Sequence, residues 1–190
     1  ANAAMSSETV DQYSLDHHRN WAYCGIATTL MLLRANGMSD EASTHRDMQS
    51  LAAQVYVTGA GTDVYKMAEV LRDRGLEDAK STRNGSMAQL LDTLDKGQPV
   101  PFGVVHSEGR VTKVNAGGSK RYPGLKAGSE HYKTFGPAGH WVLVTGYEGS
   151  RENPAHFVIN DPDMGGQLRA TRAQLERMGK GSGNFYQVTQ

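Results

Sequence analysis

Residues 24–34 read CGIATTLMLLR, and the rest of the fold is organised around this stretch. Ile26, Leu30 and Leu33 recur at helical spacing, and Gly37 follows as a residue that takes the left-handed conformation at helix ends. We therefore predict a buried helix that begins at Cys24. The dipole and amide groups of a helix N-terminus favour negative charge, so a thiol there loses its proton more readily.

Three more helices are expected in the first half of the chain. Apolar spacing and capping residues predict starts at Thr44, at Thr62 and after Ser86, where Ser86 and Gln89 form a capping-box motif. Thr171 is expected to cap a last short helix. Apolar and β-branched runs predict strands at residues 99–106, 140–147, 155–160 and 184–188. Helices followed by an antiparallel sheet indicate an α+β fold whose two halves face each other across a cleft.

The length and the net charge of the chain limit the classes of function to expect. The 190 residues suit one domain over 1–190, and 20 basic residues balance 20 acidic ones. A neutral chain gives no reason to expect nucleic acid as a partner, and no apolar run is long enough to span a membrane. The start shows no signal-peptide pattern. We expect a soluble protein and leave open whether it is secreted or delivered as an effector.

Cys24 is the one cysteine of the chain, so no intramolecular disulfide can form. Such a thiol is either a small buried hydrophobe or a nucleophile, and its place at a helix start favours the nucleophile. Gly25 would let a substrate carbonyl approach closely, and the Cys24 amide could donate to an oxyanion. One cysteine and the absence of a closely spaced His-x-x-x-His pair provide no recognisable set of zinc ligands, so neither a metal nor a cofactor is expected.

His140 and Asp161 are the residues that could activate this thiol. His140 opens a strand after the small residues 136–139, and Asp161 follows the end of the expected partner strand. A hairpin between them would place the carboxylate beside the imidazole, where it fixes the tautomer and stabilises the cation. The alternatives are an ordinary edge-strand histidine and an ordinary Asn-Asp-Pro turn. Asn160 is the second candidate for the orienting role.

These residues together resemble the papain-like superfamily, and most closely the bacteriocin-processing (double-glycine leader) peptidase family. The resemblance spans roughly residues 12–165. It is carried, in order, by Cys24-Gly25, Gly61-Thr62, Gly97-Gln98-Pro99-Val100, Gly139-His140-Trp141 and Asn160-Asp161-Pro162. It implies a papain-like fold, with Cys24 as nucleophile, His140 as general base and acid, and Asp161 as the orienting group.

The chain departs from the family pattern at two places. The family usually has a glutamine oxyanion donor six residues before the nucleophile, where this chain has His18, and Asn20 is the nearest side-chain amide. Residues 107–139 also form a longer insert than expected.

The resemblance implies a cysteine hydrolase that cleaves a peptide or amide bond of a peptide or protein through a thioester. Two alternatives stay open: glutamine deamidation or amide transfer by a bacterial effector or toxin, and a non-catalytic peptide-binding module. Whether a cognate inhibitor or an activating partner exists is also open.

Overall fold

The structure is a computed structural model that describes residues 10, 23–39, 44–57, 61–106, 138–162, 166–181 and 185–190. Several features singled out in the sequence lie outside these ranges: the lead-in before Tyr23, the candidate oxyanion donors His18 and Asn20, and residues 107–137 of the long insert.

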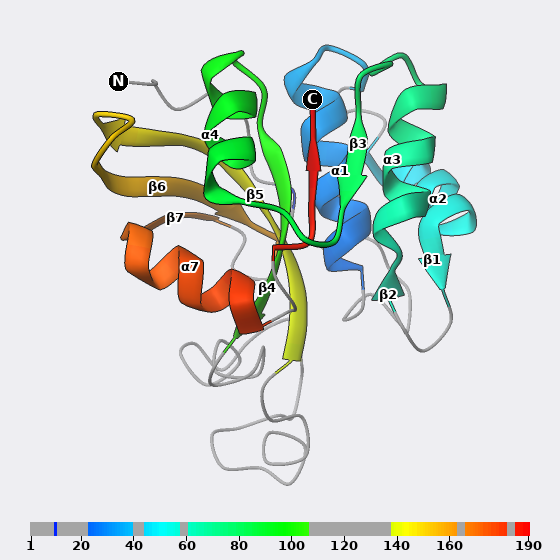
Figure 1. Ribbon diagram of the computed structural model, residues 1–190. Helices are drawn as coiled ribbons and strands as arrows, with labels where there is room; N and C mark the ends of the chain where they lie inside the picture. The colour runs from blue at the N-terminus through cyan, green and yellow to red at the C-terminus, as the bar shows by residue number, and fades with distance from the viewer. Residues whose placement is uncertain are drawn as a thin grey trace, which may run out of the picture.

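The N-terminal half is helical, as predicted. It contains α1 (Cys24–Ala35), α2 (Thr44–Val55) and α3 (Val64–Asp73), which lie together on the right of Figure 1. Between α2 and α3 the short strands β1 (Tyr56–Val57) and β2 (Gly61–Thr62) pair with each other as an antiparallel hairpin.

The rest of the chain builds an antiparallel sheet. In its described part the strand order is β3-β8-β4-β5-β6-β7, and every neighbouring pair is antiparallel. The strands are β3 (Lys80–Thr82), β4 (Val100–His106), β5 (Ala138–Gly149), β6 (Pro154–Asp161), β7 (Gly166–Ala170) and β8 (Gln187–Thr189). The combination confirms the α+β class.

Alternate residues of β5 pack into two different hydrophobic cores. Trp141 and Leu143 join the core built by α1, α2 and α3. Val142 and Val144 join a second core with α4 (Met87–Asp95) and α7 (Arg172–Gly181). Successive strand residues point to opposite faces of the sheet, so one strand ties the two cores together.

Most predicted helix starts agree with the structure. Ser86 and Gln89 form the reciprocal capping box that opens α4, with bonds of 3.1 and 3.0 Å. Thr171 and Gln174 exchange the same two bonds ahead of α7.

The predicted start of α3 at Thr62 is wrong. Thr62 belongs to β2, and Asp63 caps the helix because its carboxylate accepts from the amides of Tyr65 and Lys66. The strands β3 and β7 have no counterpart among the predicted strands, and the last strand begins at Gln187 instead of residue 184.

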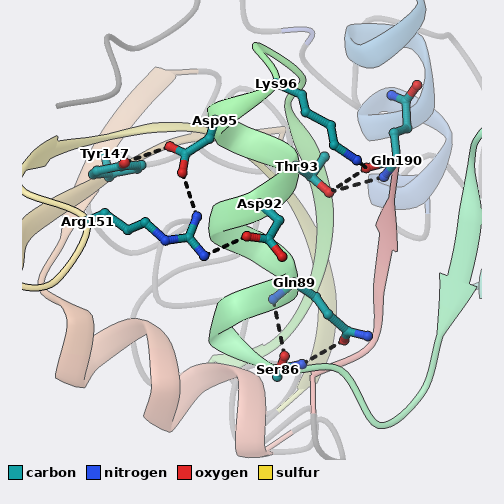
Figure 2. A network of polar contacts seen from close by, with 9 residues as sticks. All are labelled: Ser86, Gln89, Asp92, Thr93, Asp95, Lys96, Tyr147, Arg151 and Gln190. Atoms are coloured by element: carbon teal, nitrogen blue, oxygen red, sulfur yellow. Dashed lines mark hydrogen bonds and ion pairs between the residues drawn. The ribbon is translucent and has the colours of Figure 1, made fainter.

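A polar network beside α4 joins the buried Tyr147 to three side chains that are at least one-third exposed, Asp92, Asp95 and Arg151 (Figure 2). Tyr147 donates to Asp95 at 2.6 Å, and Arg151 bridges Asp95 and Asp92 at 2.5 Å each. We call these four residues the surface network. Within the described ranges, no helix combines the length and the apolar character needed to cross a bilayer.

Candidate active site

Cys24 is the first residue of α1, as the sequence predicts. The helix is mostly apolar, and its residues from Cys24 to Leu33 are buried. Only 6% of Cys24 is exposed. The residue before it, Tyr23, provides no side-chain cap. The amide groups and the dipole of the first helical turn favour a negative charge at this position.

Packing against Thr62 requires a glycine at position 25. A Cβ atom at Gly25 would lie 2.2 Å from Oγ1 of Thr62 and 2.3 Å from its Cβ. Real Cβ atoms do not approach other atoms so closely, so β2 occupies the space that a side chain would need. Helix–strand packing is thus one reason for a glycine at this position, and the close approach of a substrate carbonyl stays a prediction.

His140 and Asp161 form a buried pair. His140 is 3% exposed and Asp161 is fully buried, and Nε2 of the imidazole lies 2.7 Å from Oδ1 of the carboxylate. An ionised carboxylate only accepts hydrogen bonds, so Nε2 carries the hydrogen and donates it. In the neutral ring, Nδ1 then carries the lone pair that can take up a proton.

The sheet register explains why Asp161, and not Asn160, lies beside the imidazole. The pairing of β5 with β6 begins at Leu143 opposite Asn160. Paired residues share a face and successive strand residues alternate between faces, so Asp161 lies on the face of the sheet that carries Val142 and His140. Asn160 lies on the opposite face of the sheet, where its Oδ1 accepts a hydrogen bond from Gln167 at 3.4 Å.

Burial and two neighbouring side chains decide the charge of His140. Burial by itself lowers the pKa of the imidazole, but the charges of Asp161 and Cys24, and the hydrogen bonds to both, outweigh it. The net effect raises the pKa of His140 from 6.5 to about 9. The structure therefore brings Cys24, His140 and Asp161 together, with the imidazole between a thiol and a carboxylate. Such a group of side chains can deprotonate a thiol and return the proton to a leaving group.

Asn160, the second candidate for the orienting role, lies on the opposite face of the sheet from Asp161. His18 and Asn20 lie outside the described residues. Among the residues that the structure describes, no group of three or more histidine, cysteine or acidic side chains could hold a metal ion.

Two residues beside the site were not assigned a role from the sequence. Thr62 contacts Gly25, and Trp141 donates its indole hydrogen to the carbonyl oxygen of Thr62 at 3.3 Å. Thr62 was read as a helix start, and Trp141 only as part of a strand. Both residues fall within the motifs Gly61-Thr62 and Gly139-His140-Trp141, but a contact between segments 79 residues apart leaves no periodic pattern in the sequence.

Comparison with known proteins gives a family and a fold. The model of the Peptidase_C39 like family matches residues 8–183. No curated protein shows significant similarity to this chain.

Two solved structures share the fold. One is a double glycine motif protease from an AMS/PCAT transporter in complex with the leader peptide, with 12% identity and a TM-score of 0.55; the alignment covers 100% of this chain and 95% of that one. The other, from Bacillus anthracis, is described as a C39-like peptidase. It has 13% identity and a TM-score of 0.61, with coverage of 98% and 95%.

Proposed function

Because the chain belongs to the Peptidase_C39 like family and is a papain-like cysteine peptidase, we propose that Cys24 is its nucleophile, His140 its general base and acid, and Asp161 the group that orients His140. The family match over residues 8–183 also supports the proposal that residues 1–190 form one catalytic domain.

One observation carries this proposal: a buried imidazole that interacts with both the only thiol and a fully buried carboxylate. With a pKa of about 9, His140 is protonated at neutral pH. A protonated imidazole next to a thiol at a helix start stabilises the thiolate, which is the reactive form of cysteine.

In the first half of the proposed reaction, the Cys24 thiolate attacks the carbonyl carbon of the scissile bond. The carbon–nitrogen bond breaks, the imidazolium of His140 protonates the departing amine, and a thioester to Cys24 remains. Asp161 keeps its charge throughout and holds Nε2, so that Nδ1 is the atom that exchanges the proton.

In the second half, neutral His140 takes a proton from a water molecule, whose oxygen attacks the thioester. The carbon–sulfur bond breaks, the carboxylic acid leaves, and the thiolate–imidazolium pair is restored. The tetrahedral intermediates need hydrogen-bond donors at the developing oxyanion. We propose the amide of Cys24 as one donor and the side chain of His18 or Asn20 as the other.

The proposed substrate is a peptide or a peptide segment of a protein. The structural neighbour solved with a leader peptide supports this substrate class, because it shares the fold over the whole of this chain. Glutamine deamidation would use the same thioester chemistry on a side-chain amide, so it is an outcome that the experiment below must separate.

The test uses Cys24 as the only thiol in the chain. An iodoacetamide-based probe should label the folded protein between pH 5.5 and 7, and Cys24→Ala should abolish labelling while leaving the fold unchanged. His140→Ala should lower the labelling rate at pH 5.5 and reduce peptide turnover by about 10²–10⁴-fold. Tyr147→Phe, in the same strand but in the surface network, is the matched control and should behave as wild type.

A mixture of synthetic peptides then identifies the reaction. New amino termini detected by mass spectrometry support peptide cleavage, whereas conversion of glutamine to glutamate in intact peptides supports deamidation. A thiol that reacts only in denaturant would mean that Cys24 is a core residue and would overturn the proposal.

A further inference from the structure

Thr62 contacts the residue next to the proposed nucleophile. Its side chain fills the space above Gly25, where an added Cβ would meet three Thr62 atoms at 2.2–2.9 Å. Gly25 directly follows Cys24, so the position of the first turn of α1 depends on where Thr62 stands.

Thr62 also contacts the residue next to the proposed base. Its carbonyl oxygen accepts the indole hydrogen of Trp141 at 3.3 Å, and both residues are 8% exposed. Trp141 directly follows His140 in β5. An indole has one donor and no acceptor, so this bond fixes the orientation of the ring when it is buried.

The strand that carries Thr62 has few other connections. The described ladders pair β2 with β1 alone, in a hairpin of two residues per strand. Trp141 packs into the core built by α1, α2 and α3, so it joins the sheet to the helical half directly beside His140.

We infer that Thr62 is a positioning residue that sets the separation between the sulfur of Cys24 and the imidazole of His140. The inference rests on the roles proposed above for these two residues. One residue touches the direct neighbours of both, so a shift of Thr62 changes their distance even though Thr62 itself does not react. A displacement of about 1 Å between reacting groups can cost about 10²-fold in rate.

The shape of Thr62 matters here more than its polarity. Its hydroxyl is buried and makes no hydrogen bond to any residue in the described ranges. Valine has nearly the same shape, and its substitution keeps the backbone carbonyl that Trp141 uses. Thr62→Val is therefore the conservative variant, and it should keep the low thiol pKa of the wild type.

The decisive variant is Thr62→Gly, which removes the contact with Gly25. The pH dependence of alkylation by iodoacetamide gives the thiol pKa without any substrate. We expect this pKa to rise by about one unit towards the free value of about 8.5, which lowers the alkylation rate at pH 5.5 about tenfold. On a cleaved peptide, kcat should fall with little change in KM. The control is Thr145→Gly, which removes a different buried threonine, in β5, and tests whether any such loss of packing alters the site. It should leave the thiol pKa unchanged.

A second pair of variants tests the contact itself. Gly25→Ala alone should raise the thiol pKa and reduce turnover, because its methyl group collides with Thr62. In the Thr62→Gly background the same methyl group has room, so the double variant should be more active than Gly25→Ala alone. If Gly25 serves substrate approach instead, the double variant will be no better than Gly25→Ala, and the inference fails.

The outcomes separate this inference from the proposed function. An ordinary thiol pKa in the wild type would refute the catalytic pair. A low wild-type pKa that stays low in Thr62→Gly would refute only the positioning role. If Thr62→Gly does not fold, Trp141→Phe carries the test, because it removes the indole donor but leaves Thr62 and Gly25 in place. It should raise the thiol pKa, and an unchanged pKa would overturn the inference.

Discussion

Asp161 and Asp95 are two carboxylates with partners at nearly the same distance but in opposite surroundings. Asp161 is fully buried, 2.7 Å from His140, which is also buried. Asp95 belongs to the surface network, where it lies 2.5 Å from Arg151 and 2.6 Å from Tyr147, and its side chain is 36% exposed.

The comparison shows that distance alone does not set the strength of such a pair. Water screens exposed charges, so an exposed pair typically contributes only about 0–1 kcal/mol to stability. In a buried pair each group strongly controls the protonation of its partner. Removing one group leaves the charge of the other buried and unpaired. We therefore expect changes around the buried pair to alter chemistry, and changes in the surface network to alter stability slightly.

Beyond Cys24 and His140 themselves, the largest loss of turnover should come from removing the second oxyanion donor, which the catalytic residues need and the surface network does not. If His18 supplies the second oxyanion donor, His18→Ala should lower turnover by about 10²–10³-fold with little change in substrate affinity. Asn20→Ala is the matched control and should do little. The reverse result would assign the role to Asn20, and no effect in either variant would mean that backbone amides alone hold the oxyanion.

A somewhat smaller effect is expected at the orienting carboxylate. Asp161→Asn should reduce turnover by about 10²-fold without eliminating it, because the imidazole loses its preferred tautomer and part of its charge stabilisation. Asn160 is one residue earlier and lies on the opposite face of the sheet, so Asn160→Ala should reduce turnover far less. If Asn160→Ala proves the more damaging change, Asn160 is the orienting residue. Both variants should be measured in one peptide-cleavage assay.

The buried His140–Asp161 pair and the surface network should lose their contributions to stability at opposite ends of the pH range. The folded pKa of His140, about 9, is above its ordinary value of 6.5, so the stability it contributes is complete below pH 6.5 and is lost as pH rises through 9. Activity should fall in the same alkaline range, and Asp161→Asn should move that fall to lower pH. A pH–rate profile of kcat/KM checks both, and an alkaline limb that does not move would contradict the pairing.

Asp95 should behave in the opposite way. The hydrogen bond from Tyr147, and then the bond and charge of Arg151, lower the pKa of Asp95 below 3.8. Its contribution is therefore present above pH 3.8 and is lost as pH falls through the lower folded value.

The smallest effect is expected from Asp95→Asn at neutral pH. It weakens an exposed contact, so the thermal midpoint should fall by about 4 °C at most, and peptide turnover and thiol pKa should stay unchanged. Thermal unfolding followed by circular dichroism, together with the iodoacetamide assay, measures both. A large loss of turnover would mean that the surface network and the active site are coupled.

Local signals account for the elements that were predicted correctly. The capping boxes at Ser86 and Thr171 satisfy amide groups within one helical turn, so four consecutive residues are enough to identify them. The strand β7 was missed because it is a short pairing partner of β6, and its sequence, GQLRA, has little apolar character of its own. Pairing with a distant strand stabilises such a segment, and that partner is not visible in the segment itself.

By itself, the sequence determined which chemical groups are present and where they sit along their own elements: one thiol at a helix start, a histidine opening a strand, and an aspartate closing the partner strand. These features follow from local backbone geometry. Only the tertiary structure decided that the sheet register places Asp161 beside His140, that Asp161 and Cys24 outweigh the effect of burial and raise the pKa of His140 to about 9, and that Thr62 lies against both Gly25 and Trp141. Each depends on contacts between segments far apart in the chain, whose distances and solvent exclusion exist only after the chain has folded.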